Sequence, residues 1–154
     1  MTRLFQLTEA EFEDFAYRSI CDYAEDMTKC SDWTMSAALS NATTLFRRLL
    51  PYGANTPNHH LFSIRARSNA PTIGNAWIQT NNHDESAFLF DIYIYPAYRG
   101  CGHAHCALLA VEDYVRNLGL STIRLHVFGH NQAARNLYAK LGFSVSHVTM
   151  TKHL

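Results

Sequence analysis

The chain has 154 residues, of which 47% are apolar or aromatic and 17% charged, a composition that fits one globular domain over residues 1–154 and excludes a disordered or coiled-coil chain. Thirteen basic side chains balance thirteen acidic ones, so the composition is not that of a dedicated nucleic-acid binder. No apolar run approaches the roughly 18–20 residues that span a bilayer, and the N-terminus has no signal-peptide core. We therefore expect a cytoplasmic protein with neither a nucleic acid nor a membrane as its partner.

The first third of the chain is predicted to be mostly helical. Thr8-Glu9-Ala10-Glu11 has the form of a capping box, and apolar residues recur at helical spacing from Phe12 to Met27. A second helix is expected to begin at Asp32 and to end before Pro51. Residues 1–32 hold eight acidic and three basic side chains, so the excess of positive charge lies in the rest of the chain, where it could attract a small polyanion.

The middle of the chain changes to the pattern of strands. Three short segments near residues 59–66, 72–80 and 86–95 are rich in aromatic or β-branched side chains. Residues 69–71 and 81–84 supply the turns between them. These segments predict three consecutive strands.

Helices and strands alternate in the last third. We expect a helix from residue 104 that stops at Gly119, a buried strand over 122–128, a helix from the N-cap Asn131 to Leu141, and a last strand over 143–150. The expected order is strand, two helices, three strands, helix, strand, helix, strand. This order predicts a mixed α/β fold with one layer of sheet.

The most informative segment joins the third middle strand to the next helix, and it contains the run Arg99-Gly100-Cys101-Gly102-His103-Ala104. The two glycines let the backbone approach a ligand and take positive φ, and the amides of the helix start point to one place with the helix dipole behind them. The segment is therefore predicted to bind a pyrophosphate, with Arg99 as an added donor. A Gly-x-Gly loop alone is equally compatible with a structural turn.

The same segment offers possible zinc ligands in Cys101, His103, His105 and Cys106. On a helix these positions point in several directions and do not converge on one ion, so we expect no metal site. We also expect free thiols rather than disulfides at all four cysteines, since the chain lacks an export signal.

Two motifs resemble those of the GCN5-related N-acetyltransferase (GNAT) superfamily. The run 99–104 matches the family's Gln/Arg-x-x-Gly-x-Gly/Ala signature, and the preceding Ile92-Tyr93-Ile94-Tyr95-Pro96 resembles its fourth strand. Residues 131–143 resemble the second motif, in which Asn, Ala, Tyr and Gly-Phe recur at this spacing. The resemblance implies the acyl-CoA N-acyltransferase fold, a central mixed sheet whose fourth and fifth strands splay apart, flanked by helices.

The resemblance implies acetyl-CoA as cosubstrate and transfer of its acetyl group to a primary amine by direct attack in a ternary complex. It assigns the cofactor contacts to Ile92, Tyr93, Ile94, Arg99, Gly100, Cys101, Gly102, His103, Ala104, Asn131, Ala134 and Tyr138. Residues 99–104 would hold the pyrophosphate, and the strand edge at Ile92 to Ile94 would pair with the pantetheine arm. The Ile94 amide would donate to the acetyl carbonyl as charge develops on its oxygen.

Tyr138 is the implied general acid, which protonates or hydrogen-bonds the departing thiolate. The same position also suits a core tyrosine packed beside Leu137 and Leu141. Asp91 is the best-placed carboxylate for the general base, although family members often carry the acid where this sequence has Tyr93. A solvated charge or a strand-end hydrogen bond is the alternative role of Asp91. Fallback candidates for the base are Asp84, Glu85, His59, His60 and His126.

The acceptor pocket is expected near the connection of the first two helices, with the candidate contacts Tyr23, Trp33, Tyr52, His60 and Trp77. Aromatic side chains and an acidic first helix would suit a cationic amine, but each of these residues is more often an ordinary core or surface residue than a ligand contact. The alternatives to an acetyltransferase are a non-catalytic acyl-CoA-binding module of the same fold and an acyltransferase that uses another acyl-CoA. A homodimer is compatible with the sequence.

Overall fold

The order of the elements follows the predicted mixed α/β pattern except at the C-terminus. The computed structural model describes residues 2–154. Its elements are β1 (Arg3–Gln6), α1 (Glu9–Cys30), α2 (Met35–Leu49), β2 (His59–Arg65), β3 (Gly74–Asn81), β4 (Ser86–Ile94), α3 (His103–Asn117), β5 (Thr122–Leu125) and α4 (Gln132–Lys140), with short 3₁₀ turns at Gly53–Asn55 and Pro96–Tyr98.

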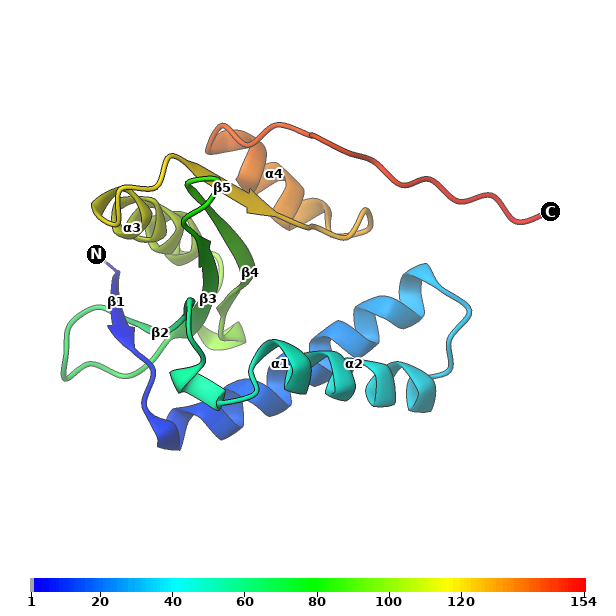
Figure 1. Ribbon diagram of the computed structural model, residues 1–154, viewed down its shortest axis with the longest axis horizontal. Coiled ribbons are helices and arrows are strands. Elements are labelled where there is room, and N and C mark those ends of the chain that lie inside the picture. The colour runs from blue at the N-terminus through cyan, green and yellow to red at the C-terminus, as the bar shows by residue number, and fades with distance from the viewer. Residues whose placement is uncertain (1) are drawn as a thin grey trace.

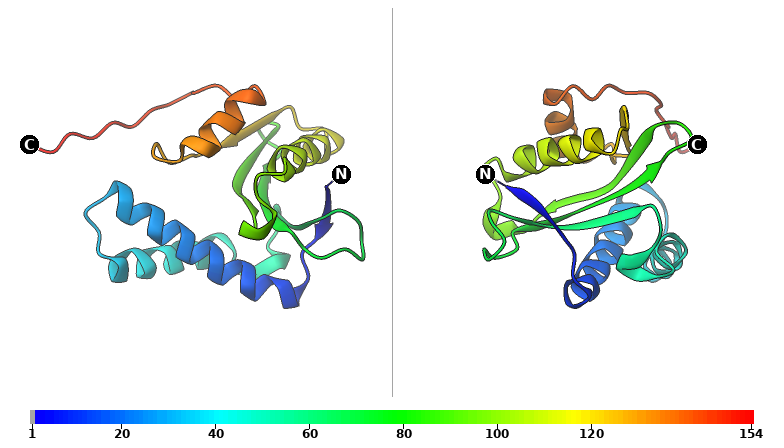
Figure 2. Two further views of the ribbon diagram at one scale, coloured as in Figure 1. Left: turned by 180° about the vertical axis from the view of Figure 1, so that it is seen from behind. Right: turned by 60° about the vertical axis from the view of Figure 1, so that its left-hand side comes forward.

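The sheet has the spatial order β1-β2-β3-β4-β5 (Figure 1). Neighbouring strands are antiparallel from β1 to β4, whereas β4 and β5 run parallel and are connected through α3. Helices α1 and α2 cover one face of the sheet and α3 covers the other (Figure 2). The sheet therefore has a protected core on each face.

The two faces have different cores. The face toward α3 buries aliphatic side chains such as Ile64, Ile78 and Val111. The face toward α1 and α2 buries aromatic ones, and the Trp77 ring contacts Phe15 edge-on, with ring centroids 5.9 Å apart. Helices α1 and α2 also pack against each other through Ala24, Ala38 and Ala42, so they form one layer on their face of the sheet, separate from α3.

The start of α2 and the end of β5 differ from the prediction. A capping residue explains the first difference, and the position of β5 in the sheet explains the second. The second helix begins at Met35 rather than at Asp32, because the side chain of Thr34 accepts the hydrogen bond from the Ala37 N–H. The strand after α3 was predicted to be buried over 122–128, but β5 ends at Leu125 and half of its side chains are exposed. Among the described residues it is one of the two edge strands of the sheet, so its partner, β4, lies on one side only.

The predicted strand over residues 143–150 is wrong. After Gly142 the chain leaves α4 and runs outward in an extended conformation, beside no other strand (Figure 1). Residues 144–154, which we call the tail, are all exposed. Residues 143–150 have the sequence pattern of a strand, but in the structure they do not pair with the sheet.

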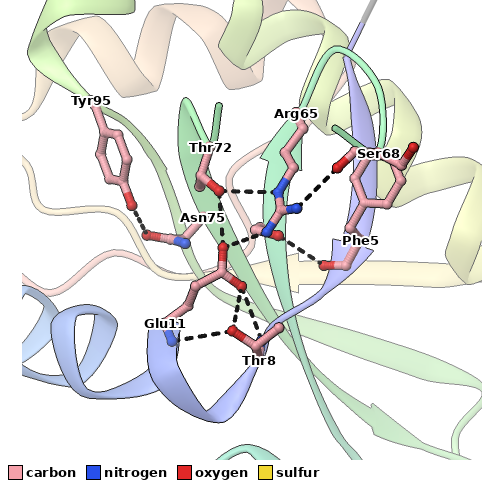
Figure 3. A network of polar contacts seen from close by, with 9 residues as sticks. Phe5, Thr8, Glu11, Arg65, Ser68, Thr72, Asn75 and Tyr95 are labelled. Carbon is pink, nitrogen blue, oxygen red and sulfur yellow. Dashed lines mark hydrogen bonds and ion pairs between the residues drawn. The ribbon is translucent and has the colours of Figure 1, made fainter. Parts of the chain in front are cut away.

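The start of α1 is tied to the sheet by one carboxylate (Figure 3). Glu11 accepts hydrogen bonds from the Thr8 N–H at 3.0 Å, from Thr72 at 2.9 Å and from Arg65 at 2.5 Å. The Thr8 hydroxyl accepts in return from the Glu11 N–H, so the predicted capping box is confirmed. Burial raises the pKa of Glu11, but these hydrogen bonds outweigh it and hold the pKa below its ordinary value.

Glu11→Gln is expected to lower the free energy of unfolding at neutral pH by about 1–2 kcal/mol, because several charge-assisted hydrogen bonds are lost together. A carboxyl whose pKa is depressed by folding stabilises the protein above its unfolded pKa, and this contribution disappears as pH falls through the folded pKa. The difference between wild type and variant should therefore shrink toward zero in acid. Denaturant titrations at several pH values would measure it, with the exposed Glu13→Gln as the matched control. A pH-independent difference would contradict the assigned role of the charge.

None of the helices in the described residues is long and apolar enough to cross a membrane.

Candidate active site

The glycine loop (residues 99–102) joins the end of β4 to α3 and presents its backbone to open space. Gly100 and Gly102 both have φ +78°, and Gly102 is the left-handed N-cap of α3. A Cβ built on either glycine would meet no atom within 4 Å. The glycines are thus required by the backbone conformation rather than by crowding, and the space above them is free for a ligand.

The first turn of α3 adds donors to this surface. The N–H of Cys106 makes the first bond of the helix, to the Gly102 carbonyl at 3.1 Å. The amides that precede it belong to the first turn, where N–H groups have no acceptor within the helix. With the positive end of the helix dipole behind them, they form a surface for an anion.

Arg99 links this loop to the end of β4. Its Nε donates to the Ile94 carbonyl at 2.8 Å, and its guanidinium lies 5.0 Å from the centre of the Tyr93 ring. The rest of the guanidinium lies at the surface beside the loop. Arg99 can therefore add a positive charge to the anion surface while it holds the strand end in place.

Strands β4 and β5 part in the middle of β4. Their pairing runs only from Ser86 to Leu89, whereas β4 continues to Ile94. At the same point the register of β4 against β3 shifts, because Trp77 pairs with Asp91 while the next residue of β3, Ile78, pairs with Leu89. This β-bulge bends β4 where it leaves β5. The result is the β4–β5 gap, the splayed opening that the resemblance implied.

The C-terminal half of β4, beyond Leu89, directs backbone hydrogen-bonding groups toward this gap. The N–H of Tyr95 bonds the Ile73 carbonyl on the β3 side at 2.9 Å. Backbone groups alternate in direction along a strand, so the N–H of Ile94 points the other way, into the gap. The bond from Arg99 to the Ile94 carbonyl agrees with this direction. The gap therefore has a backbone donor suited to a developing oxyanion.

Helix α4 carries Tyr138. Asn131 caps the helix, as predicted, and accepts a hydrogen bond from the Ala134 N–H at 3.2 Å. The Tyr138 ring packs against the aliphatic core and edge-on against Phe143. Burial raises the pKa of Tyr138 to about 12, and the negative charge of Asp91 adds to this effect. The hydroxyl is therefore protonated at neutral pH and can donate a proton.

Asp91 is held by α1. Its carboxylate accepts from Arg18 at 2.6 Å and from the Ser19 hydroxyl at 3.4 Å. Arg18 also donates to Asp22 at 3.1 Å, and its guanidinium lies 3.9 Å from the centre of the Tyr93 ring. Burial raises the pKa of the Asp91 carboxyl, and Arg18 acts in the opposite direction.

Arg18 is the residue of this site that sequence reasoning missed. It lies 73 positions from Asp91, and no local pattern marks it. One guanidinium is the partner of two carboxyl groups, so the cluster of Arg18, Asp22 and Asp91 has a net negative charge when both carboxyls are ionised. Such a cluster favours a proton or a cationic group nearby.

The predicted acceptor residues do not form one pocket. Tyr23 on α1 lies near the gap, with its ring 6.0 Å from that of Phe128 in the loop after β5. The same loop is tied to α1 by His130, whose Nε2 lies 2.9 Å from an Asp26 oxygen. Trp33 is exposed at the connection between α1 and α2.

The other three candidates lie elsewhere. Tyr52 is exposed beside the first turn of α1, next to a hollow of about 260 Å³ that it lines with Glu9. The His60 ring faces α3, where its Nδ1 lies 2.9 Å from the Tyr114 hydroxyl. Trp77 is buried on the opposite face and donates to His59 at 2.9 Å. His60 and Trp77 therefore lie on opposite faces of the sheet.

Comparison with known proteins adds to this geometry. The sequence matches the model of the acetyltransferase (GNAT) family over residues 9–143. It is 36% identical over 146 residues to the N-acetyltransferase YycN of Bacillus subtilis (strain 168), which covers 94% of this chain and 93% of that protein. The crystal structure of YycN superposes with a TM-score of 0.95 over 100% of this chain and 99% of that one, at 35% identity. A PaiA N-acetyltransferase of Thermoplasma acidophilum in complex with coenzyme A shares the fold, with a TM-score of 0.73 and 16% identity over 97% of this chain and 93% of that one.

Proposed function

The chain belongs to the acetyltransferase (GNAT) family, and on that premise we propose that it transfers the acetyl group of acetyl-CoA to a cationic primary amine by direct attack in a ternary complex. It is an N-acetyltransferase, an acyltransferase that acts on an amine. The observation that carries the proposal is the β4–β5 gap, which has an anion surface at one end and a protonated tyrosine at its side.

In this proposal the glycine loop and the first turn of α3 (residues 99–104) bind the pyrophosphate through backbone amides and Arg99. Their support is the positive φ of the two glycines and the open space above them. The free edge of β4 at Ile92, Tyr93 and Ile94 receives the pantetheine arm. The hydrogen bond between Asn131 and Ala134 fixes the start of α4. Tyr138, on the same helix, then approaches the thioester sulfur from the side opposite the β4 edge.

The chemistry requires three groups of the protein. The amine nitrogen attacks the thioester carbon, and the Ile94 N–H stabilises the negative charge that forms on the oxygen. The carbon–sulfur bond then breaks, and Tyr138 gives its proton to the departing sulfur. The ammonium must first lose a proton, which we assign to Asp91, directly or through water. The nitrogen loses a second proton as the amide forms, and this proton returns through water to Tyr138.

The Arg18 cluster supports this assignment and the choice of a cationic acceptor. Asp91 and Asp22 share one guanidinium, so Arg18 keeps Asp22 as its partner when Asp91 takes a proton. An ammonium group is attracted to the net negative charge before it is deprotonated. The acceptor then approaches between α1 and the loop after β5, past Tyr23, with Trp33 beyond the end of α1. Tyr52, His60 and Trp77 have no part in this proposal.

The test is a screen of polyamines, peptide N-termini and lysine side chains with acetyl-CoA, in which free thiol release and the mass of the acceptor are both followed. We expect one class to gain an acetyl group with matching thiol release, and Asp91→Asn to lower that rate.

Cys101→Ala should keep most turnover, since direct transfer involves no acyl-cysteine. Tight binding of acetyl-CoA without turnover of any amine would favour the non-catalytic module, and faster reaction with succinyl-CoA would favour another acyl donor.

A further inference from the structure

A row of aromatic rings crosses the α1-facing side of the sheet and ends at the β4–β5 gap. Trp77 is stacked on Phe90 with ring centroids 4.5 Å apart, and Phe88 meets Phe90 at 4.7 Å and His126 at 5.2 Å, both edge-on. Trp77 is buried, Phe90 and Phe88 are half-buried, and His126 is exposed. We call Phe88, Phe90 and His126 the aromatic row, which leads from the core to the surface.

The aromatic row stands where the two strands part. The last pair between β4 and β5 joins Leu89 to Leu125, so Phe90 and His126 are the next residues on the two sides. The β-bulge then adds Asp91 to the same face, because Phe90 packs in the core toward α1 while the Asp91 carboxylate bonds that helix. Consecutive Cα atoms are only about 3.8 Å apart. The proposed base therefore lies beside an aromatic ring.

A second group of rings lies along α1 and the loop after β5. The Tyr23 ring lies 6.0 Å from that of Phe128, which is stacked on His130 at 5.4 Å. Tyr23 follows Ser19 by one helical turn, and Ser19 donates to Asp91, so both residues face the same side of α1. An acceptor that passes Tyr23 on its way to the gap thus meets aromatic rings from a helix, a strand and a loop.

The charges along this path suit one ammonium group. Asp22 pairs with Arg18 at 3.1 Å, and an Asp26 oxygen lies 2.9 Å from a His130 nitrogen. Two carboxylates around one guanidinium leave the Arg18 cluster a single negative charge for the acceptor. A second ammonium group would lose its water against the half-buried rings, whereas an aromatic group gains from burial and from edge-on or stacked contacts.

We propose that the acceptor is a primary amine with an aromatic group close to its nitrogen, an inference that rests on the proposed function. The aromatic group packs on the aromatic row while the ammonium meets Asp91. Because Phe90 and Asp91 are consecutive, the spacer between ring and nitrogen is short, about two or three atoms. A free 2-arylethylamine and the N-terminal phenylalanine of a peptide both have this spacing.

The test compares four acceptors by thiol release with acetyl-CoA: 2-phenylethylamine, a short peptide with an N-terminal phenylalanine, n-butylamine and putrescine. We expect kcat/KM for at least one aromatic amine to be ten times or more that for butylamine and putrescine, mainly through a lower KM. The faster of the two aromatic amines identifies the source of the group. If butylamine or putrescine reacts as fast as both, the inference fails and the proposed function stands.

Variants of the row locate the cause of the preference. Phe88→Ala and His126→Ala should each lower the ratio of kcat/KM for the better aromatic amine to that for butylamine at least fivefold. His126→Phe retains a ring and should keep the ratio, which separates packing from proton transfer by the imidazole. Phe5→Ala, in the half-buried part of the opposite edge strand β1, is the matched control and should not change the ratio. A ratio that none of the row variants lowers would overturn the proposal.

Binding without turnover separates this inference from the proposed function. In calorimetric titrations of the enzyme with coenzyme A, 2-phenylethylamine should bind at least tenfold more tightly than butylamine, and Phe88→Ala should remove most of the difference. If no amine is acetylated, the proposed function fails, and this difference would still support the aromatic row as a binding site. Equal affinities for the two amines would overturn it.

Discussion

Tyr138→Phe is expected to lower kcat about 10²-fold while the affinity for acetyl-CoA changes little. A positioned acid typically contributes about 10²–10⁴-fold, and the low end applies because a thiolate is a tolerable leaving group without its proton. The phenylalanine ring keeps the packing against Phe143, so the fold and the cofactor site should persist. The loss should therefore appear in kcat rather than in KM, as for an interaction made mainly in the transition state.

The pH dependence of kcat is a second measurement that tests the role of Tyr138. The acid must be protonated to act, so its contribution is lost only as pH rises through its pKa. With the pKa of Tyr138 raised to about 12, the wild-type enzyme should show no alkaline decline from this group in the ordinary assay range. Tyr17→Phe, which removes a hydroxyl from an exposed ring of α1, is the matched control. Wild-type turnover in Tyr138→Phe, with chemistry rate-limiting, would make Tyr138 a packing residue.

Gly102→Val is expected to weaken acetyl-CoA binding at least tenfold. A β-branched residue at φ +78° is strained, so the loop must change its conformation and turn its amides away from the phosphates. Calorimetric titration with acetyl-CoA would measure the loss. The cause is the backbone, because a Cβ at this position has no neighbour to collide with.

Gly119→Val is the control that separates binding from strain. Gly119 lies just beyond the other end of α3, with the same φ of +78° and the same open surroundings. Both variants should lose a similar amount of stability, of the order of 1–3 kcal/mol. Only Gly102→Val should lose affinity. Equal affinities in the two variants would show that the glycine loop does not bind the pyrophosphate.

Features with a local cause could be predicted from the sequence. The Thr8 capping box, the Asn131 cap and the glycine at the end of α3 each depend on residues within one turn, and the structure confirms all three. The splayed strands followed from the resemblance of two motifs rather than from propensity. The tail is the counter-example, because its pattern predicts a strand and residues 144–154 form none.

Contacts between distant segments could not be predicted. No sequence pattern near Arg18 predicts its hydrogen bond to Asp91, because α1 and β4 come together only in the folded chain. The bulge in β4 also interrupts the alternation of successive side chains between the two faces of the sheet. Leu89 and Asp91 are two apart, yet Leu89 packs in the core toward α3 while Asp91 meets α1. His60 and Trp77 were grouped together although their strand positions place them on opposite faces.

In the proposed mechanism, helix α1 also sets the width of the opening through which the acceptor enters. It is fastened to β4 through Arg18 and to the loop after β5 through Asp26, eight residues and therefore about 12 Å farther along the helix axis. A helix does not stretch, so a bulkier acceptor has to break one of the two fastenings. The bond of Asp26 to His130 is the more exposed of the two and would yield first, which swings the loop rather than the catalytic strand. In the proposed mechanism, changes of acceptor size are thus accommodated on the β5 side, while the Ile94 N–H, the proposed donor to the thioester, keeps its place.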